Sequence, residues 1–285
     1  MISGDRESRC RRRPVRRTAA ACLAAFSLAG VGVLHDAGRA HAEPMLPNSS
    51  SELGVDGLDL TQIPFLRDLL APRTDPSSGR TGCGNVIQIG DSTSVGIDDA
   101  SHAPNPADRL TARYRSVGAR TVALDAVGGR SIVERVNGAP NADEAVATHR
   151  ARGDRGCWVI AMGVNDAANI VVGSRVGADE RIDRIMKQLR GQPVLWPTVV
   201  TGSTTVRGYS AAGMRSFNDA LRRALSRYPN LAVYDWAAEV SPAWFADGIH
   251  YTATGTAERN RRFAAALAVA FPVGATTPAV RWVRS

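Results

Sequence analysis

The sequence predicts an α/β fold in which a five-stranded parallel sheet is covered by helices on both faces. Short, almost wholly apolar segments recur along the chain, and segments with apolar residues at helical spacing separate them. Strands that are apolar on both faces and alternate with helices are typical of parallel sheets buried between two helical layers. Ligands bind at the carboxyl ends of the strands in such sheets, so the polar residues that follow each strand are the first place to look for function.

Five strands are predicted from short runs rich in apolar residues, over 86–89, 121–124, 158–162, 194–200 and 231–234. Apolar residues at helical spacing predict helices over 106–117 and 142–152. Two further helices follow from the stripes Ile182, Ile185, Met186, Leu189 and Met214, Phe217, Leu221, Leu225. Ser210 is the expected N-cap of the second of these, and an Ala-rich helix over 255–271 completes the pattern.

The first 42 residues are typical of an export signal. An Arg-rich stretch, an uncharged run from Thr18 to Leu34 and the triplet Ala40-His41-Ala42 follow one another in the order of a secretory signal peptide. We predict cleavage after Ala42 and a secreted or cell-envelope location. A retained N-terminal anchor is the alternative, and the choice between general and twin-arginine export stays open.

The remaining 243 residues divide into three predicted segments: a linker or N-terminal extension over 43–80, a main domain over 81–272 and a C-terminal tail over 273–285. The formal net charge of +8 is concentrated before them, because residues 1–42 hold eight arginines against three acidic residues. The rest of the chain carries only +3. Basicity is therefore weak support for a polyanionic partner, and we expect no nucleic-acid partner.

Polar groups follow four of the five predicted strands. They are Gly90-Asp91-Ser92-Thr93, Gly128-Gly129-Arg130-Ser131, Gly163-Val164-Asn165-Asp166 and Asp247-Gly248-Ile249-His250. Each group alone is a common turn or helix-cap sequence. Their combination, with every group at or shortly past a strand end, predicts one shared site.

The residue types in these groups are those of nucleophilic acyl transfer. The Ser92 hydroxyl needs a base to take its proton, and His250 can act as that base. Asp247 lies three residues before His250 and can hold its imidazole in the required tautomer. The backbone N–H groups of Ser92 and Gly129 and the amide of Asn165 are candidate donors to the oxyanion of the tetrahedral intermediate.

In their types and order these four groups resemble the SGNH (GDSL-type) hydrolase family over about residues 85–270. The resemblance implies a flavodoxin-like three-layer α/β/α sandwich, a catalytic triad of Ser92, Asp247 and His250, and an oxyanion hole of Ser92, Gly129 and Asn165. The main domain would then be the hydrolase domain. Thr93 departs from the Leu that many members have beside the nucleophile, and Gly128 competes with Gly129 for the glycine position.

The predicted function is an exported serine esterase that hydrolyses short-chain acyl esters through an acyl-enzyme. The alternative is an acyltransferase or deacetylase that acts on cell-wall carbohydrate or lipid with the same triad. A non-enzymatic wall-binding module is a third reading, disfavoured because no triad residue is lost. We expect a small-molecule, glycan or lipid ester as substrate, with association with the cell envelope left open, and a monomer. No cofactor and no metal are expected, since the chain has no HxH, HExxH or CxxC spacing.

Cys83 and Cys157 are the two cysteines that follow the predicted signal peptide. They are either a disulfide, which an exported protein can form, or two small buried thiols. In the fold that the resemblance implies, they begin neighbouring parallel strands, and a disulfide at the amino edge of the sheet is then expected.

A few side chains near these groups have less specific predictions. Arg130 is predicted to be a solvated surface residue, with contact to an anionic substrate group as the alternative. His149 is also predicted at the surface. The aromatic residues Trp236, Trp244 and Phe245 are predicted to pack in the core and its loops, with the wall of a substrate pocket as the alternative.

Overall fold

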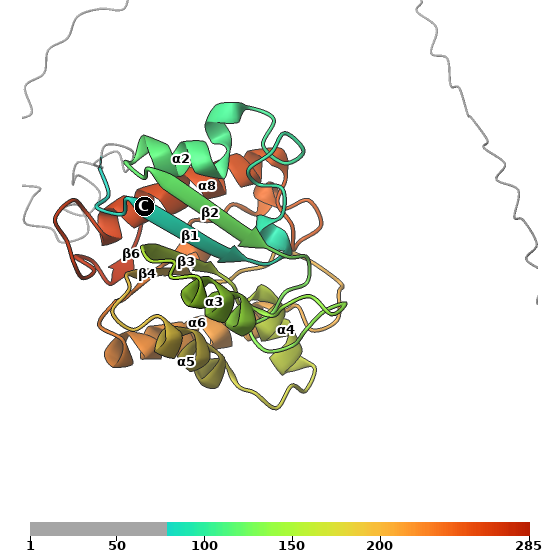
Figure 1. The fold of residues 1–285 in the computed structure, drawn as a ribbon. Coiled ribbons are helices and arrows are strands. Elements are labelled where there is room, and N and C mark those ends of the chain that lie inside the picture. The colour runs from blue at the N-terminus through green and yellow to red at the C-terminus, as the bar shows by residue number, and fades with distance from the viewer. Residues whose placement is uncertain (1–78) are drawn as a thin grey trace, which may run out of the picture. The chain divides into compact units, whose positions relative to one another are not determined.

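The computed structural model describes residues 79–285. The predicted signal peptide and almost all of the predicted linker, residues 1–78, lie outside the described residues. A parallel sheet with the strand order β2-β1-β3-β4-β5-β6 forms the centre of the described part (Figure 1). Its strands are β1 (Asn85–Gly90), β2 (Thr121–Ala126), β3 (Cys157–Ala161), β4 (Val194–Pro197), β5 (Leu231–Tyr234) and β6 (Trp282–Val283). The order of the first five strands is that of flavodoxin-like sheets, so the predicted fold class is confirmed.

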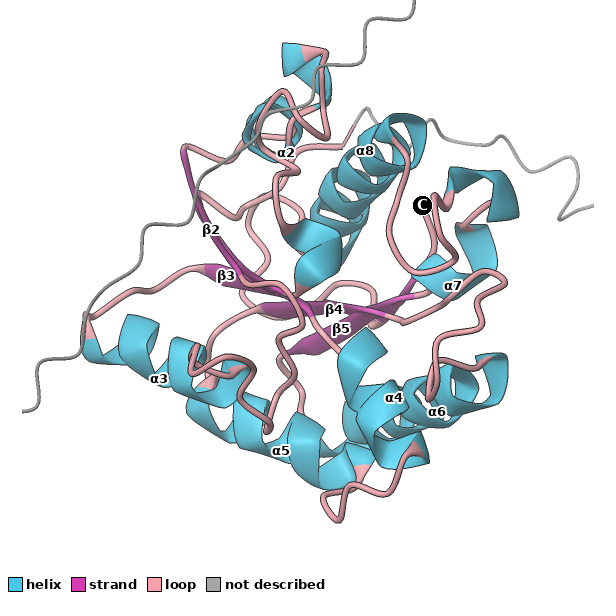
Figure 2. Cartoon of the chain, turned by 90° about the vertical axis from the view of Figure 1, so that its right-hand side faces the viewer, coloured by secondary structure: helices cyan, strands magenta, loops and turns pink. Residues whose placement is uncertain are grey.

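Helices cover both faces of the sheet, as Figure 2 shows. On one face lie α2 (Leu110–Ser116) and α8 (Ala253–Ala270), and on the other lie α3 (Ala142–Ala151), α4 (Val164–Val171), α5 (Ala178–Gln188) and α6 (Ala211–Arg227). The short helix α7 (Trp236–Glu239) and three 3-10 turns, η3 (Ser92–Ser94), η4 (Pro106–Asp108) and η5 (Pro242–Trp244), lie in the connections. No helix among residues 79–285 is long and apolar enough to cross a membrane.

The core consists of two apolar clusters, one on each face of the sheet. Alternate residues of a strand point to opposite faces, so Ile87 and Trp158 pack with α3, α5 and α6, whereas Val86 and Val159 pack with α2 and α8. Both sets are almost wholly buried. This two-sided burial explains why the strands read as continuous apolar runs rather than as alternating ones.

Three of the helices, α3, α6 and α8, begin at a residue whose side chain caps the helix. Asn141 and Glu144 form a capping box at the start of α3. Ser210 caps α6 as predicted, because its hydroxyl accepts a hydrogen bond from the Gly213 N–H. Thr252 caps α8 in the same way. The last cap fixes the chain two residues after His250.

The sheet differs from the prediction at β4 and β6. β4 ends at Pro197 rather than at residue 200, because the Asn218 side chain on α6 hydrogen-bonds both the N–H and the C=O of Val199 and replaces a strand partner. The segment 273–285, predicted as a tail, instead supplies a sixth strand, in which Val283 is fully buried beside β5. Two residues are too few to produce a periodic pattern in the sequence.

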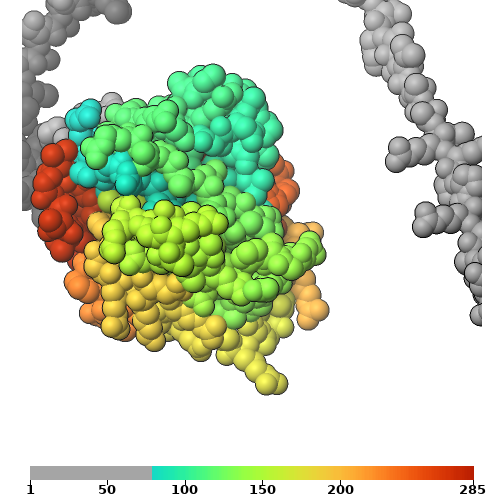
Figure 3. All heavy atoms as spheres, in the orientation of Figure 1, coloured from blue at the N-terminus to red at the C-terminus, as the bar shows by residue number. Residues whose placement is uncertain are grey.

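The start of the described chain meets the segment that follows α8 at the amino edge of the sheet. Thr81 forms an antiparallel bridge with Pro272, and Figure 3 shows the first described residues beside the C-terminal ones. At the same edge Cys83 and Cys157 form a disulfide bond, with their Cα atoms 5.6 Å apart. Cys157 starts β3 opposite Val86 of β1, which places the bond between neighbouring strands. The disulfide expected from the family resemblance is therefore present in the structure.

Candidate active site

Ser92 begins the tight turn η3 directly after β1. The buried Asp91 carboxylate caps this turn, because its Oδ1 accepts hydrogen bonds from the Thr93 N–H at 2.9 Å and the Thr93 hydroxyl at 2.7 Å. Thr93 thus holds the turn through its hydroxyl at the position where the resemblance suggested Leu. The result is a rigid turn in which Ser92 stays partly exposed while both of its neighbours are buried.

His250 and Asp247 lie on the loop between η5 and α8, and His250 reaches Ser92. His250 Nε2 is 2.9 Å from Ser92 Oγ, and His250 Nδ1 is 2.7 Å from Asp247 Oδ2. The other oxygen of Asp247 accepts the backbone N–H groups of Ile249 and His250. Gly248 makes this tight loop possible, since its φ is +82° and an added Cβ would lie 2.1 Å from the Ser203 carbonyl oxygen.

Hydrogen bonds to Asp247 stabilise the negative charge of its carboxylate. Slight burial opposes ionisation, but the His250 ring and the two backbone N–H groups outweigh it and lower the pKa of Asp247 to about 2. The carboxylate is therefore ionised at every pH at which an imidazole can act as a base. An ionised Asp247 can accept the Nδ1 hydrogen of His250 and leave Nε2 to face Ser92.

Gly129 lies on the loop after β2. That loop is joined to the end of β1 by a hydrogen bond from the Val127 N–H to the Gly90 carbonyl. Gly129 has φ of +72°, a backbone conformation that favours glycine, whereas Gly128 has an ordinary φ. Within residues 79–285, neither the Ser92 nor the Gly129 N–H donates to another protein group. Both donors are thus available to a ligand.

Asn165 lies in the first turn of α4, just after β3. Its Nδ2 donates to the Arg130 carbonyl at 2.8 Å, which joins the loop after β2 to the end of β3. Its Oδ1 accepts a hydrogen bond from the Tyr209 hydroxyl at 2.6 Å. The structure therefore brings together all five predicted site residues or their loops. It also adds Tyr209, which follows β4 and which the sequence analysis did not single out.

A buried ion-pair network supports this part of the site. Arg181 on α5 is fully buried and pairs with Asp166 and Glu134. Asp166 Oδ1 also accepts the Ile132 N–H at 2.8 Å. Full burial raises the pKa of Asp166, although the Ile132 N–H and Arg181 favour its charge. The network connects α4, α5 and the loop after Gly129, and Arg181 gave no sequence signal because it stands beside the apolar stripe of α5.

Two predictions of surface position are wrong. Arg130 is 3% exposed and pairs with Asp125 at 2.8 Å, so it is a buried structural residue rather than a solvated one. His149 is also buried, with its ring against Trp158 and its Nδ1 2.7 Å from Asp154. In both cases a carboxylate five residues away in the sequence offsets the burial of a polar side chain.

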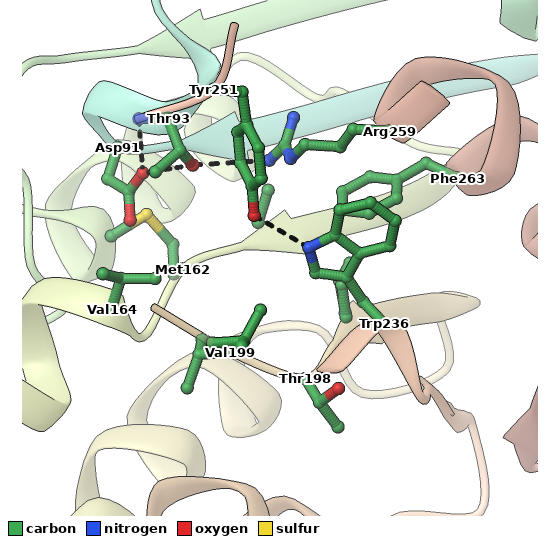
Figure 4. Close-up of a pocket in the computed structure, with 13 residues that line it drawn as sticks. Asp91, Thr93, Met162, Val164, Thr198, Val199, Trp236, Tyr251, Arg259 and Phe263 are labelled. Carbon is green, nitrogen blue, oxygen red and sulfur yellow. Dashed lines mark hydrogen bonds between the residues drawn. The ribbon is translucent and has the colours of Figure 1, made fainter. Parts of the chain in front are cut away.

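A small cavity lies behind the turn η3, on the α8 side of the sheet (Figure 4). Its volume is about 20 Å³, and its walls include Asp91, Thr93 and Trp236. Trp236 is 2% exposed and stacks on Trp244, and Phe245 stacks on Tyr251, which agrees with the packing role predicted for these aromatic residues. Among residues 79–285 there is no cluster of three or more His, Cys, Asp or Glu side chains that could hold a metal ion.

The site lies where the strand order changes direction, between β1 and β3, which is the usual binding position in doubly wound sheets. The model of the GDSL-like lipase/acylhydrolase family matches residues 89–257, a range that includes all four polar groups described above. The chain belongs to this family. It is accordingly a carboxylic-ester hydrolase of the GDSL type, and the resemblance inferred from the sequence is confirmed.

Several solved structures are similar to this GDSL-type hydrolase in fold. One is a carbohydrate acetylesterase family member from Sinorhizobium meliloti, with 19% identity over 62% of this chain and 93% of that one, at a TM-score of 0.48. A second is the native aryl esterase of M. smegmatis, with 19% identity over 65% and 96% and a TM-score of 0.48. A third is a lipolytic G-D-S-L family member from Veillonella parvula, with 14% identity over 64% and 95% and a TM-score of 0.46. No curated protein matches the chain.

Proposed function

We propose that this hydrolase is an exported serine esterase in which Ser92 attacks the ester carbonyl carbon of a short-chain acyl ester. His250 Nε2 takes the Ser92 proton as the new bond forms, and Asp247 stabilises the resulting imidazolium. The tetrahedral intermediate collapses, the ester C–O bond breaks, and the alcohol leaves with the proton from His250. The observation that carries the proposal is the unbroken series Asp247–His250–Ser92, with atom separations of 2.7 and 2.9 Å.

The second half of the reaction uses the same residues. The acyl group is now an ester of Ser92, and His250 takes a proton from a water molecule that attacks it. Collapse returns that proton to Ser92 Oγ and releases the carboxylic acid. In both halves negative charge develops on the carbonyl oxygen, and the N–H groups of Ser92 and Gly129 and the amide of Asn165 are the donors that we assign to it.

Hydrolysis is favoured over acyl transfer by the exposure of the base. The His250 side chain is 44% exposed and that of Asp247 is 55% exposed, so water reaches the base without a conformational change. Transfer to a carbohydrate hydroxyl would require water to be excluded during deacylation. Product analysis with and without a glycan acceptor separates the two, since an acylated glycan forms only in transfer.

A preference for short acyl chains is part of the proposal. We expect kcat/KM to fall from acetyl and butyryl esters to esters of eight or more carbons, and a series of esters with one common alcohol measures it.

Export rests on the sequence of residues 1–42, with its Arg-rich start, apolar run and Ala40-His41-Ala42. It agrees with a disulfide in the hydrolase domain, because such bonds persist in oxidising compartments. N-terminal sequencing of protein from the culture medium or cell wall should give Glu43 as the first residue. Recovery of only the full-length chain in membranes would contradict cleavage and favour an anchor.

Covalent labelling tests the mechanism directly. A fluorophosphonate probe should label the wild-type hydrolase at Ser92, and Ser92→Ala should abolish both labelling and ester hydrolysis. Ser226→Ala, which removes an exposed serine hydroxyl on α6, is the matched control and should be labelled like the wild type. Labelling or hydrolysis that persists at the wild-type level in folded Ser92→Ala would contradict the assignment of the nucleophile.

A further inference from the structure

The loop after β4, residues 198–210, is the one strand-end connection near the site for which the sequence suggested no role. The structure places it between the two halves of the site. The Gly202 N–H donates to the Gly248 carbonyl on the loop that carries Asp247 and His250, at 2.8 Å. Seven positions later, near the end of the loop, Tyr209 contacts the oxyanion candidate Asn165. One connection therefore touches both the base loop and the oxyanion side.

Tyr209 is held firmly for a loop residue. Its side chain packs against the apolar cluster between the sheet and α6, and the next residue, Ser210, is the N-cap of that helix. Its backbone N–H donates to the Val206 carbonyl in a turn. Gly208 lies so close to α4 that an added Cβ would be 2.8 Å from the Ala168 carbonyl oxygen. The position of the Tyr209 hydroxyl is therefore fixed by α4 and α6 together.

The orientation of the Asn165 amide follows from its two partners. A backbone carbonyl can only accept, so the Arg130 oxygen requires the NH₂ group of Asn165 on its side. The amide oxygen then faces Tyr209, whose hydroxyl donates to it. Burial, followed by the negative charge of Asp91, raises the pKa of Tyr209, so the hydroxyl keeps its proton and remains a donor.

We propose that Tyr209 is a positioning residue of the oxyanion hole, which fixes the Asn165 amide so that one N–H binds Arg130 and the other faces the substrate. The inference rests on the proposed function, because it needs Asn165 to act as an oxyanion donor. Tyr209 acts through Asn165 and does not touch the reacting atoms. Removal of its hydroxyl frees the amide to rotate away from the orientation that the transition state requires. Stabilisation of the transition state is then weakened, whereas the affinity for the substrate changes much less.

A double-mutant cycle tests this inference. Tyr209→Phe should lower kcat about three- to tenfold, the usual range for one hydrogen bond, with KM within about twofold of wild type. Asn165→Ala alone should lower kcat about 10²- to 10³-fold. In the Asn165→Ala background, Tyr209→Phe should change kcat less than about twofold, because the group through which it acts is gone.

Tyr228→Phe is the matched control. It also removes a tyrosine hydroxyl that donates to a side-chain oxygen, Asp183 Oδ1 at 2.9 Å, but at the opposite end of the sheet. It should leave kcat and KM unchanged, and melting curves should show that all variants are folded. Two results overturn the inference: an unchanged kcat in folded Tyr209→Phe, or the same fold-loss in both Asn165 backgrounds. If the fluorophosphonate probe fails to label Ser92 in the wild-type protein, the proposed function is overturned instead.

Discussion

The two edges of the sheet differ in the residues that the strands place there. At the carboxyl edge, Ser92, His250 and Asp247 are partly exposed and meet from loops far apart in sequence. At the amino edge, Cys83 and Cys157 are buried and joined covalently. In a parallel sheet all strands end at one edge, so polar side chains that follow strands converge there without disturbing the core. We propose that residues at the carboxyl edge carry the reaction, whereas those at the amino edge mainly stabilise the fold, and this division can be tested.

The largest expected effect is at the carboxyl edge. Ser92→Ala and His250→Ala should each lower kcat about 10⁴-fold or more, and the double variant should be little worse, because the two residues act as a unit. Both side chains are partly exposed, so their removal should change the melting temperature little. Steady-state kinetics and thermal melts measure the two effects separately. Multiplicative losses in the double variant would show that the residues act independently.

Asparagines at the two edges provide a sharper comparison. Asn165→Ala should lower kcat about 10²- to 10³-fold through loss of an oxyanion donor. Asn230 also donates from its side chain to backbone carbonyls, those of Leu189 and Gln192, but at the amino edge. Asn230→Ala should therefore lower the melting temperature and leave kcat within about twofold. A large loss of kcat in Asn230→Ala would mean that the edges are coupled.

Removal of the disulfide should affect stability alone. Cys83 and Cys157 are 74 residues apart in sequence, and a loop of that size corresponds to about 4 kcal/mol in the chain-entropy model, often less in practice. The double variant Cys83→Ala/Cys157→Ala should unfold at lower denaturant concentration, with kcat/KM within about twofold of wild type. Two reactive thiols in denatured, non-reduced wild type would show instead that the bond is not formed.

The sequence predicted most of the fold and pointed to the residues of the candidate site, for identifiable reasons. Buried parallel strands produce apolar runs, and the residues after them are free to be polar, so Ser92, Asn165 and His250 stood out. β6 was missed because two residues carry no periodicity. β4 was predicted to be too long because the end of this strand depends on Asn218, which contacts Val199 only in the folded chain.

The burial and the contacts of single polar side chains could not be predicted from local sequence. Arg130 and His149 looked like surface residues although Asp125 and Asp154 are only five residues away, because the sequence does not show that the fold buries these side chains. Tyr209 lies in a Ser-, Thr- and Gly-rich loop, and its contact with Asn165 spans 44 residues. The one available signal in the sequence was that Tyr209 is a lone aromatic residue in a polar loop after a strand. That strand is β4, whose end had no assigned role.

The network of Arg181, Asp166 and Glu134 is the expected exception to this division between the edges. It lies at the carboxyl edge, yet Arg181 and Asp166 are fully buried, so it should contribute to stability as well as to the position of the Gly129 loop. Glu134 is the partly exposed member of the network. Partial burial opposes its ionisation, but hydrogen bonds from Arg181, Ser131 and Ser174 outweigh it and hold the pKa of Glu134 well below its usual range.

A carboxylate whose pKa is lower in the folded state than in the unfolded state stabilises the fold above its unfolded pKa, near 4.3, and loses that contribution as pH falls towards its folded pKa. Glu134→Gln should therefore lower the melting temperature at pH 7 by roughly 2–4 °C, which corresponds to about 1 kcal/mol in a domain of this size once solvent screening is allowed for. The difference from wild type should shrink as pH falls from about 5 to 3. Glu180→Gln, which breaks the exposed pair with Arg184, is the control and should have little effect at any pH. A destabilisation by Glu134→Gln that grows as pH falls would contradict the assignment, because it would mean that the carboxyl group stabilises the fold in its protonated form.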